Sequence, residues 1–320
     1  MKEISIGIDI GGTNSVIGIV DKHGTVICHD SILTANYKTP ELFVEECAAL
    51  INKLLKSIPE QCGLVGIGIG APNGNYYKGT IEFAPNLKWK GIIEFVNIFK
   101  SHFDVPTFLT NDANAAALGE LIYGDAKGMK DFVVVTLGTG LGSGFVINGN
   151  LVYGHDGFAG ELGHTIVFPE KGRLCGCGRK GCLETYCSAT GIVRTVIELM
   201  EESDEDSELR SIKKEKITSK LIAEAALRGD ALANSAFDYT AKILGMKLAD
   251  VVAITSPEAI FLFGGLAQSG DLILKPTKEY MEKYMLPIFK NKVKLLHSKL
   301  EGTTAAILGA SALVWNEVSC

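Results

Sequence analysis

Residues 132–153 read FVVVTLGTGLGSGFVINGNLVY, and residues 4–28 read ISIGIDIGGTNSVIGIVDKHGTVIC. Each stretch predicts a strand, a turn rich in glycine and threonine, a second strand, a short turn and a third strand. The first turns occupy equivalent places, at Gly11-Gly12-Thr13 and at Gly138-Thr139-Gly140. A pattern that occurs twice in one chain indicates a duplicated fold. We therefore expect an α/β protein whose two similar halves face each other across a cleft.

The bulk composition agrees with a compact two-domain protein. A chain of 320 residues exceeds what one core usually supports, and 47% hydrophobic residues with 36 glycines are typical of an α/β fold with many turns. The net charge of −6 argues against a nucleic-acid or acidic membrane partner. No signal peptide precedes the first strand, and no apolar run reaches the roughly 18 residues of a membrane span. We expect a cytoplasmic protein.

The rest of the chain alternates buried strands with helices. Short apolar runs predict strands at 64–70, 105–109 and 259–263. Helices are expected from Thr39 to Leu55 and at 92–100, 113–121, 188–200, 219–228, 231–254, 279–285 and 302–314. The charged segment 201–220 is expected to be a solvated loop or helix tip. We divide the chain into a small α/β domain, 1–112 plus the C-terminal helix 302–320, and a large α/β domain, 113–301.

The glycine turns do not match the common nucleotide-binding motifs. The run from Gly138 to Gly144 is followed by a strand, whereas a dinucleotide-binding loop leads into a helix, and the chain contains no P-loop motif. A hairpin of glycine and threonine still offers unhindered backbone N–H groups and a hydroxyl to a phosphate. A single such hairpin is as well explained as a simple tight turn, but two matched ones favour phosphate binding.

Two aspartates stand near the ends of predicted strands, where ligands bind in α/β sheets. Asp9 precedes the first hairpin, and a carboxylate there suits a Mg²⁺ held through water beside phosphate oxygens. Asp112 follows Asn111 at the start of the helix 113–121. It can act as the cap of that helix or as a general base for transfer of a phosphoryl group to an alcohol, and the residues themselves leave both interpretations open.

A metal site is predicted by one histidine and three cysteines within nineteen residues. These are His164, Cys175, Cys177 and Cys182. Three thiolates and one imidazole form the tetrahedral donor set of a structural zinc. Clustered cysteines in a chain without a secretory signal favour metal over disulfides. Glu161 and Glu184 flank the ligands but are not needed by the metal, so the zinc loop, 164–182, is expected to hold polar groups in place for another ligand.

Five motifs in this order resemble the ROK family of sugar kinases and repressors. They are Asp9-x-Gly-Gly-Thr13, the run from Asn111 to Glu120, the run from Leu137 to Gly144, Gly160-Glu-Leu-Gly-His164, and Cys175-x-Cys-Gly-x-x-Gly-Cys182-x-Glu184. The resemblance covers essentially the whole chain. It implies an actin-like, ribonuclease-H-like fold of two domains with an interdomain cleft, and it implies ATP, Mg²⁺ and structural Zn²⁺. It also implies phosphorylation of a hexose 6-hydroxyl, with a homodimer as the assembly.

The resemblance also assigns roles to residues. Asp112 is the implied catalytic base. The implied substrate-binding residues are Asn86, Asn111, Asp112, Glu161, His164 and Glu184. The expected cofactor-binding residues are Asp9, Gly11, Gly12, Thr13, Thr139, Gly140 and Gly265. His164 would contact the sugar while binding zinc through its other ring nitrogen. Many members have lysine after Gly-Gly-Thr, but this chain has Asn14, so one positive charge near the phosphates is missing.

Several other kinds of protein compete with a sugar kinase as the interpretation of this sequence. A repressor of this family carries a winged helix before the first strand, but here only three residues precede Ile4 and the chain is acidic. A sugar sensor without activity would not need Asp112 and both hairpins. Carboxylates around the zinc argue against a filament or chaperone. We expect an ATP-dependent hexose kinase with glucose as the favoured substrate, and N-acetylmannosamine or N-acetylglucosamine as the alternatives.

Overall fold

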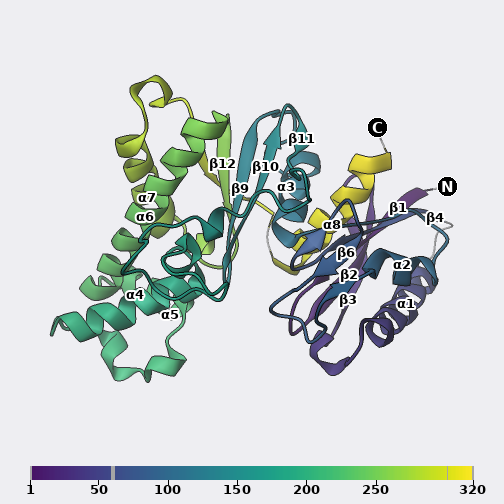
Figure 1. The fold of residues 1–320 in the computed structure, drawn as a ribbon, viewed down its shortest axis with the longest axis horizontal. Coiled ribbons are helices and arrows are strands. Elements are labelled where there is room, and N and C mark those ends of the chain that lie inside the picture. Colours follow the sequence, from purple (N-terminus) through teal and green to yellow (C-terminus); the bar gives the residue numbers. More distant parts are fainter. Residues whose placement is uncertain (1, 59–61, 301, 319–320) are drawn as a thin grey trace.

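The computed structural model describes residues 2–58, 62–300 and 302–318, and two five-stranded sheets dominate this part of the chain (Figure 1). The first sheet has the order β3-β2-β1-β4-β8 and the second the order β11-β10-β9-β12-β13. The first contains β1 (Lys2–Ile10), β2 (Ser15–Asp21), β3 (Val26–Ile32), β4 (Cys62–Gly70) and β8 (Thr107–Thr110). The second contains β9 (Phe132–Leu137), β10 (Leu141–Ile147), β11 (Asn150–Leu151), β12 (Ala259–Phe263) and β13 (Lys294–His297).

The two sheets repeat one topology. In each, the central strand pairs antiparallel with the strand that follows it in the chain and parallel with the strand on its other side. The outermost strands repeat this arrangement. On one side β3 and β11 pair antiparallel with β2 and β10, and on the other β8 and β13 pair parallel with β4 and β12. This repetition confirms the duplicated α/β fold that the two glycine-rich hairpins predict. A small third sheet joins β5 (Gly74–Asn75), β6 (Thr80–Glu82) and β7 (Ile92–Ile93).

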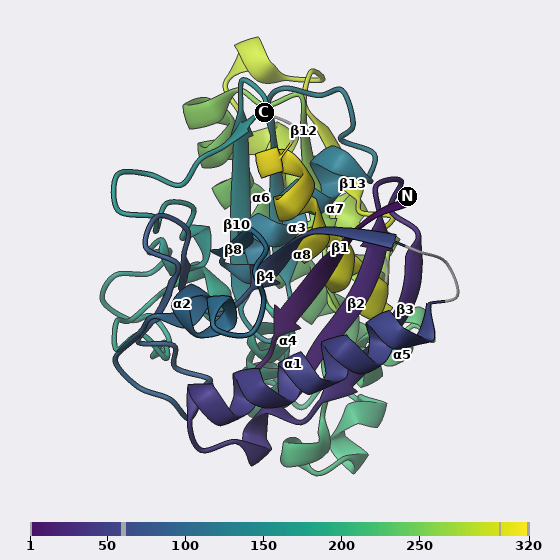
Figure 2. The ribbon, with the colours of Figure 1, turned by 90° about the vertical axis from the view of Figure 1, so that its right-hand side faces the viewer.

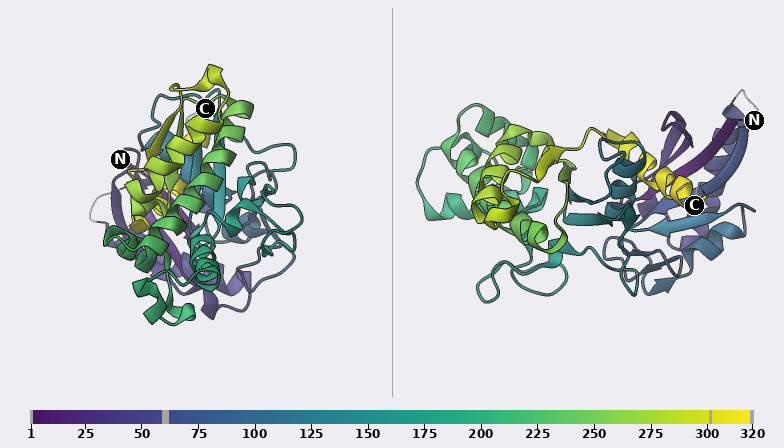
Figure 3. Two further views of the ribbon diagram at one scale, coloured as in Figure 1. Left: turned by 90° about the vertical axis from the view of Figure 1, so that its left-hand side faces the viewer. Right: turned by 90° about the horizontal axis from the view of Figure 1, so that it is seen from above.

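The helices form outer layers and a shared inner layer. The bounds are α1 (Pro40–Ser57), α2 (Phe95–Lys100), α3 (Asp112–Ile122), α4 (Ala189–Glu202), α5 (Ser219–Leu227), α6 (Ala231–Thr255), α7 (Asp271–Tyr284) and α8 (Gly302–Val318). Helix α1 crosses one face of the first sheet, and α8 lies behind it (Figure 2). Helices α4 to α7 cover the far side of the second sheet, while α3 and α8 lie between the two sheets (Figures 1 and 3).

The alternation of residues in β1 explains how α8 comes so close to the first sheet. Ile4, Ile6 and Ile8 are fully buried in the core that includes α1. Ser5 and Gly7 point the other way, where the Ser5 hydroxyl hydrogen-bonds that of Ser311 at 2.8 Å. A Cβ added to Gly7 would lie 2.1 Å from the carbonyl oxygen of Ile307. Small residues on this face therefore let the helix backbone pack directly on the strand.

Two predicted helices have wrong boundaries. The helix expected at 92–100 begins only at Phe95, because Ile93 pairs with Ile81 in the small sheet. The helix expected at 279–285 is instead α7, which begins at Asp271 and contains Pro276. Proline usually ends a helix, but packing of α7 against α6 overrides that preference here.

Other segments were missed or described only broadly. The strands β5, β6 and β13 were not predicted, because a strand of two to four residues carries too little periodic signal. The segment 201–220 begins in the last turn of α4 and ends at the start of α5, and between them it contains two short 3-10 helices, η4 (Glu208–Ser211) and η5 (Lys214–Lys216). The other 3-10 helices are η1 (Thr34–Asn36), η2 (Leu162–His164), η3 (Leu183–Thr185), η6 (Ala267–Ser269) and η7 (Pro287–Phe289). Within the described ranges, no helix is both long and apolar enough to cross a membrane.

Candidate active site

A cavity of about 350 Å³ opens between the two halves, beside the ends of β1, β4, β8 and β9. It gathers most of the residues that the sequence marks as functional, although they are spread over more than 170 positions of the chain. Those lining it are Asp9, Gly11, Gly12, Asn86, Asn111, Asp112, Thr139, Gly140, Glu161 and Glu184. The duplicated topology therefore places both glycine hairpins around one cavity, together with Glu161 and Glu184, the carboxylates predicted to bind a sugar.

Three of the predicted substrate- and cofactor-binding residues are not among those lining this cavity. His164 lines an adjoining cavity of about 500 Å³, which shares Asn86, Thr139, Gly140 and Glu184 with the first. Thr13 and Gly265 line neither of the two. The adjacent Gly264 borders a third cavity, behind the hairpins. Nucleotide contacts of Thr13 and Gly265 thus remain predictions.

Sequence reasoning missed several residues of the site. Pro72 and Asn73 lie just beyond the end of β4, and Ser143 and Gly160 line the cavity from the second half. Asn73 has a left-handed backbone with φ of 51°, and its side-chain amide donates to the carbonyl oxygen of Glu82 at 3.0 Å. The available signal was the Ala71-Pro-Asn-Gly74 break at the end of a parallel strand, which marks the edge of the sheet where ligands bind.

The first hairpin packs directly against the loop that carries Asn86. The Gly11 amide donates to the carbonyl oxygen of Asn14 at 3.1 Å, which closes the turn. A Cβ added to Gly12 would lie 2.5 Å from the carbonyl oxygen of Asn86. Gly12 is therefore required by close approach of two backbones, and the hairpin fixes the position of a predicted sugar contact.

The substitution Gly12→Ala is expected to destabilise the protein. Its methyl group meets backbone atoms that cannot rotate away, which typically costs about 1–3 kcal/mol in the free energy of unfolding. Gly138→Ala is the matched control in the second hairpin, since no atom outside the local chain lies within 4 Å of an added Cβ. Thermal unfolding of both variants measures the effect. Equal melting temperatures would contradict the packing argument.

The start of α3 separates the roles of two neighbouring polar residues. Asn111 is the N-cap, and its side-chain oxygen accepts the Asn114 amide at 2.6 Å. Asp112 is the first helical residue, and its Oδ1 accepts the Ala113 amide at 2.8 Å. Asn111, and not Asp112, therefore supplies the N-cap of α3. The exposed carboxylate of Asp112 is left facing the cavity.

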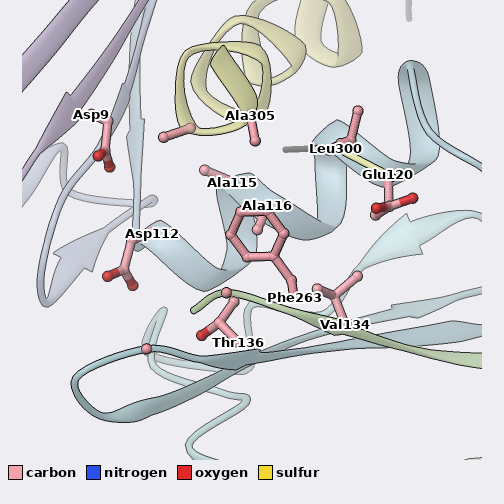
Figure 4. Close-up of a pocket in the computed structure, with 13 residues that line it drawn as sticks. Asp9, Asp112, Ala115, Ala116, Glu120, Val134, Thr136, Phe263, Leu300 and Ala305 are labelled. Atoms are coloured by element: carbon pink, nitrogen blue, oxygen red, sulfur yellow. The ribbon is translucent and has the colours of Figure 1, made fainter. Parts of the chain in front are cut away.

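Asp9 and Asp112 line the same end of one cavity, Asp9 from the end of β1 and Asp112 from the start of α3 (Figure 4). The Asp112 side chain is open to the cavity, but the protein on both sides of the cleft desolvates its carboxyl group and raises its pKa. Burial, followed by the negative charge of Asp112, raises the pKa of Asp9 to about 7. Two neighbouring carboxylates repel each other when both are ionised. A divalent cation between or beside them relieves this repulsion and stabilises the ionised form of both. The donor chemistry around Asp9 therefore fits Mg²⁺.

The four predicted metal ligands form one cluster. The ligand atoms of His164, Cys175, Cys177 and Cys182 all lie within 4.8 Å of one another. Cys177 and Cys182 approach to 3.6 Å between their sulfur atoms. Two tight backbone bonds shape the turn, from the Cys175 amide to the Arg179 carbonyl oxygen and from the Gly178 amide to the Cys175 carbonyl oxygen. This compact set of one imidazole and three thiols fits a tetrahedral zinc.

The histidine joins this cluster to the cavity. His164 Nδ1 lies 3.7 Å from Cys175 Sγ, while Nε2 lies 3.9 Å from Glu161 Oε2. The Cys175 thiol also donates to Glu184 Oε1 at 2.9 Å. Partial removal of the Cys177 thiol from water opposes its ionisation, but hydrogen bonds from the backbone and guanidinium of Arg179 lower the pKa of this thiol to about 6. Glu161, His164 and Glu184 therefore form one wall that is tied to the predicted zinc ligands.

The fold and the site are those of a two-domain α/β protein with paired glycine hairpins and a polar cleft between its halves. The sequence profile of the ROK family matches residues 5–317, and the chain belongs to this family. The glucokinase of Halalkalibacterium halodurans is 36% identical over 97% of this chain and 94% of its own length. The xylose repressor of Caldicellulosiruptor bescii is 32% identical over 98% of this chain and 78% of its own.

The comparison with solved structures agrees. A ROK-family glucokinase from Streptomyces griseus, solved in complex with glucose and AMPPNP, superimposes with a TM-score of 0.82. It is 32% identical in sequence, and the superposition covers 98% of this chain and 99% of that one. The resemblance to the ROK family and the predicted actin-like fold of two domains are both confirmed.

Proposed function

We propose that this protein is an ATP-dependent glucose kinase that phosphorylates the 6-hydroxyl. The observation that carries the proposal is the position of Asp112, which faces one cavity together with both glycine hairpins and the carboxylates Glu161 and Glu184. Full-length relatives named glucokinase and the glucose- and AMPPNP-bound structure support this activity.

The hairpins supply the phosphate-binding side of the cavity. The backbone N–H groups of Gly12 and Gly140 and the hydroxyls of Thr13 and Thr139 hold the phosphates of ATP. Gly11 closes the turn that presents them, and Gly265 contacts the nucleotide. Such fixed dipoles stabilise the charge of the transferring group without reorganising during the reaction. Asn14 adds no charge, so this side works through amides and the cation rather than a lysine. Mg²⁺ held by Asp9 through water would neutralise charge on the phosphate oxygens.

The opposite side of the cavity holds the sugar. Glu161 and Glu184 accept hydrogen bonds from ring hydroxyls, His164 contributes a ring nitrogen, and Asn86 closes the site from the first half. The side-chain oxygen of Asn111 is occupied by its helix, but its amide N–H₂ group is free to donate to a hydroxyl. Zinc bound by His164, Cys175, Cys177 and Cys182 would fix the orientation of this wall.

The transfer itself needs one base. Asp112 accepts the proton of the 6-hydroxyl as the hydroxyl oxygen attacks the γ-phosphorus in line. The new O–P bond forms while the bond to the β-phosphate oxygen breaks, and ADP leaves. We also propose that the small domain, 1–112 with 302–320, and the large domain, 113–301, close around both substrates. Closure excludes water, which would otherwise compete as acceptor.

A coupled assay of ADP release over a panel of sugars tests the activity. The panel contains glucose, mannose, glucosamine, N-acetylglucosamine and N-acetylmannosamine. We expect the highest kcat/KM with glucose, and the product is glucose 6-phosphate by NMR. Preference for an N-acetyl sugar would move the assignment to a kinase of that sugar. No turnover of any sugar, together with measurable sugar binding, would favour a sugar-sensing protein instead.

We further propose a cytoplasmic homodimer that binds neither nucleic acid nor membrane. The described cysteines are all free thiols, which suits a reducing compartment. The net charge of −6 opposes binding to phosphate backbones and acidic lipids. Exposed apolar side chains near η7, such as Leu286 and Ile288, are suited to a subunit interface. Light scattering after size exclusion measures the assembly.

A further inference from the structure

The two chain connections between the halves meet at one buried side chain. The chain passes from the first sheet to the second through α3 and returns after β13. Glu120 lies in the last turn of α3, and Ser298 directly follows β13. The Ser298 hydroxyl donates a hydrogen bond to Glu120 Oε1, and both residues are 1% exposed. Residues 178 positions apart are therefore joined at the junction of the halves.

The Glu120 carboxylate has partners in each connection. Its Oε2 accepts the Asp125 amide, in the first connection, at 3.2 Å. The Ser298 hydroxyl in turn accepts the Leu300 amide, in the second connection, at 3.1 Å. The Ser298 amide donates to the carbonyl oxygen of Leu262 in β12 at 2.9 Å. A buried carboxylate is costly unless it is well hydrogen-bonded, and here its bonds hold a helix end and both connections together.

A cavity of about 220 Å³ runs along α3 from Asp9 and Asp112 to Glu120 (Figure 4). Its walls are mostly apolar and come from both halves of the protein. Ala305 lies on α8 in the first half and Phe263 at the end of β12 in the second, with Ala116 of α3 beside them. This space separates elements that belong to different halves, so it can shrink when the halves approach each other.

Helix α3 links this junction to the reaction centre. Asp112 is its first residue and Glu120 its ninth, so about 12 Å of rigid helix separate them. A change in the direction of the helix at Glu120 therefore displaces the Asp112 carboxylate. Displacement of a reacting group by about 1 Å can lower a rate about a hundredfold.

We propose that Glu120 is a positioning residue, bonded to Ser298 as the pivot about which the halves close, and that the cavity beside it is the space closure consumes. This inference rests on the proposed sugar kinase function. Without the hydrogen bond between Ser298 and Glu120, α3 and the second connection move independently. The Asp112 carboxylate is then no longer held in a single position relative to the sugar hydroxyl.

The test compares Ser298→Ala with Ser298→Thr and Lys299→Ala. Lys299 pairs with Asp125 at 2.8 Å and so joins the same two connections, but this ion pair is exposed and screened by water. For Ser298→Ala we expect kcat to fall about tenfold and the glucose-induced decrease in radius of gyration, measured by small-angle X-ray scattering, to diminish. ADP affinity should change less than twofold. Ser298→Thr should recover most of kcat, and Lys299→Ala should behave like wild type.

A cavity-filling variant provides an independent measurement. Ala116→Leu extends into the space without removing a hydrogen bond, so it should fold with an unchanged or higher melting temperature while reducing compaction and lowering kcat about tenfold. Wild-type compaction and kcat in both Ser298→Ala and Ala116→Leu would overturn the pivot. If the wild-type protein neither binds nor phosphorylates glucose, the proposed function fails instead, and the two failures are distinguishable.

Discussion

Asp112→Asn is expected to abolish sugar phosphorylation while glucose binding persists. Asparagine keeps the shape of the side chain and an oxygen that accepts the Ala113 amide, so α3 begins as before. It cannot accept the proton of the 6-hydroxyl. Loss of a general base typically costs about 10²–10⁴ in rate, and we expect kcat to fall at least a thousandfold. Coupled ADP release measures kcat, and calorimetry measures the Kd for glucose.

A matched control for this variant exists elsewhere in the chain. Asp271 is the first residue of α7, as Asp112 is of α3, but it lines none of the three cavities described at the cleft. Asp271→Asn therefore loses the same charge at a helix N-terminus without touching the site. It should retain wild-type kcat. Turnover above one tenth of wild type in Asp112→Asn would reject Asp112 as the base.

Cys177→Ala is expected to remove zinc and, with it, sugar binding. The Cys177 side chain is exposed, so truncation leaves no cavity in a core, and the effect measured is loss of a ligand. Without zinc, the ring of His164 loses the metal bond that would fix it toward the sugar, and the loop that leads from Cys182 to Glu184 loses its anchor. Disturbing the groups that orient a metal site typically costs 10–100-fold, and loss of the metal itself should raise the Kd for glucose about a hundredfold or more.

Zinc content and glucose affinity are measured on the same preparations. Cys62→Ala serves as the control, because Cys62 is a free cysteine at the start of β4, outside the cluster. It should keep one zinc per chain and wild-type affinity. A zinc-free Cys177→Ala protein with wild-type glucose affinity would refute the coupling between metal and sugar. Full zinc content in that variant would refute the ligand assignment.

The site was predictable where a motif carries its own geometry. Cys175, Cys177 and Cys182 are so close in sequence that one turn brings their sulfur atoms together. The hairpins were predictable because glycine marks tight turns wherever it occurs between strands. The sequence could not decide whether Asp112 caps helix α3 or acts as the general base, since both roles suit an aspartate after a strand. Only the backbone shows that Asn111 occupies the N-cap and leaves Asp112 facing the cavity.

The sequence by itself determined the duplicated fold, the metal-binding cluster and the polar residues of the site, because periodicity, turns and short-range spacing are local properties. The tertiary structure alone decided that Asn86 packs against the Gly12 hairpin, that Glu184 links the zinc loop to the cavity, and that Glu120 meets Ser298. Such contacts join residues far apart in the chain. They depend on how two sheets and their shared helices pack, and no local pattern encodes that arrangement.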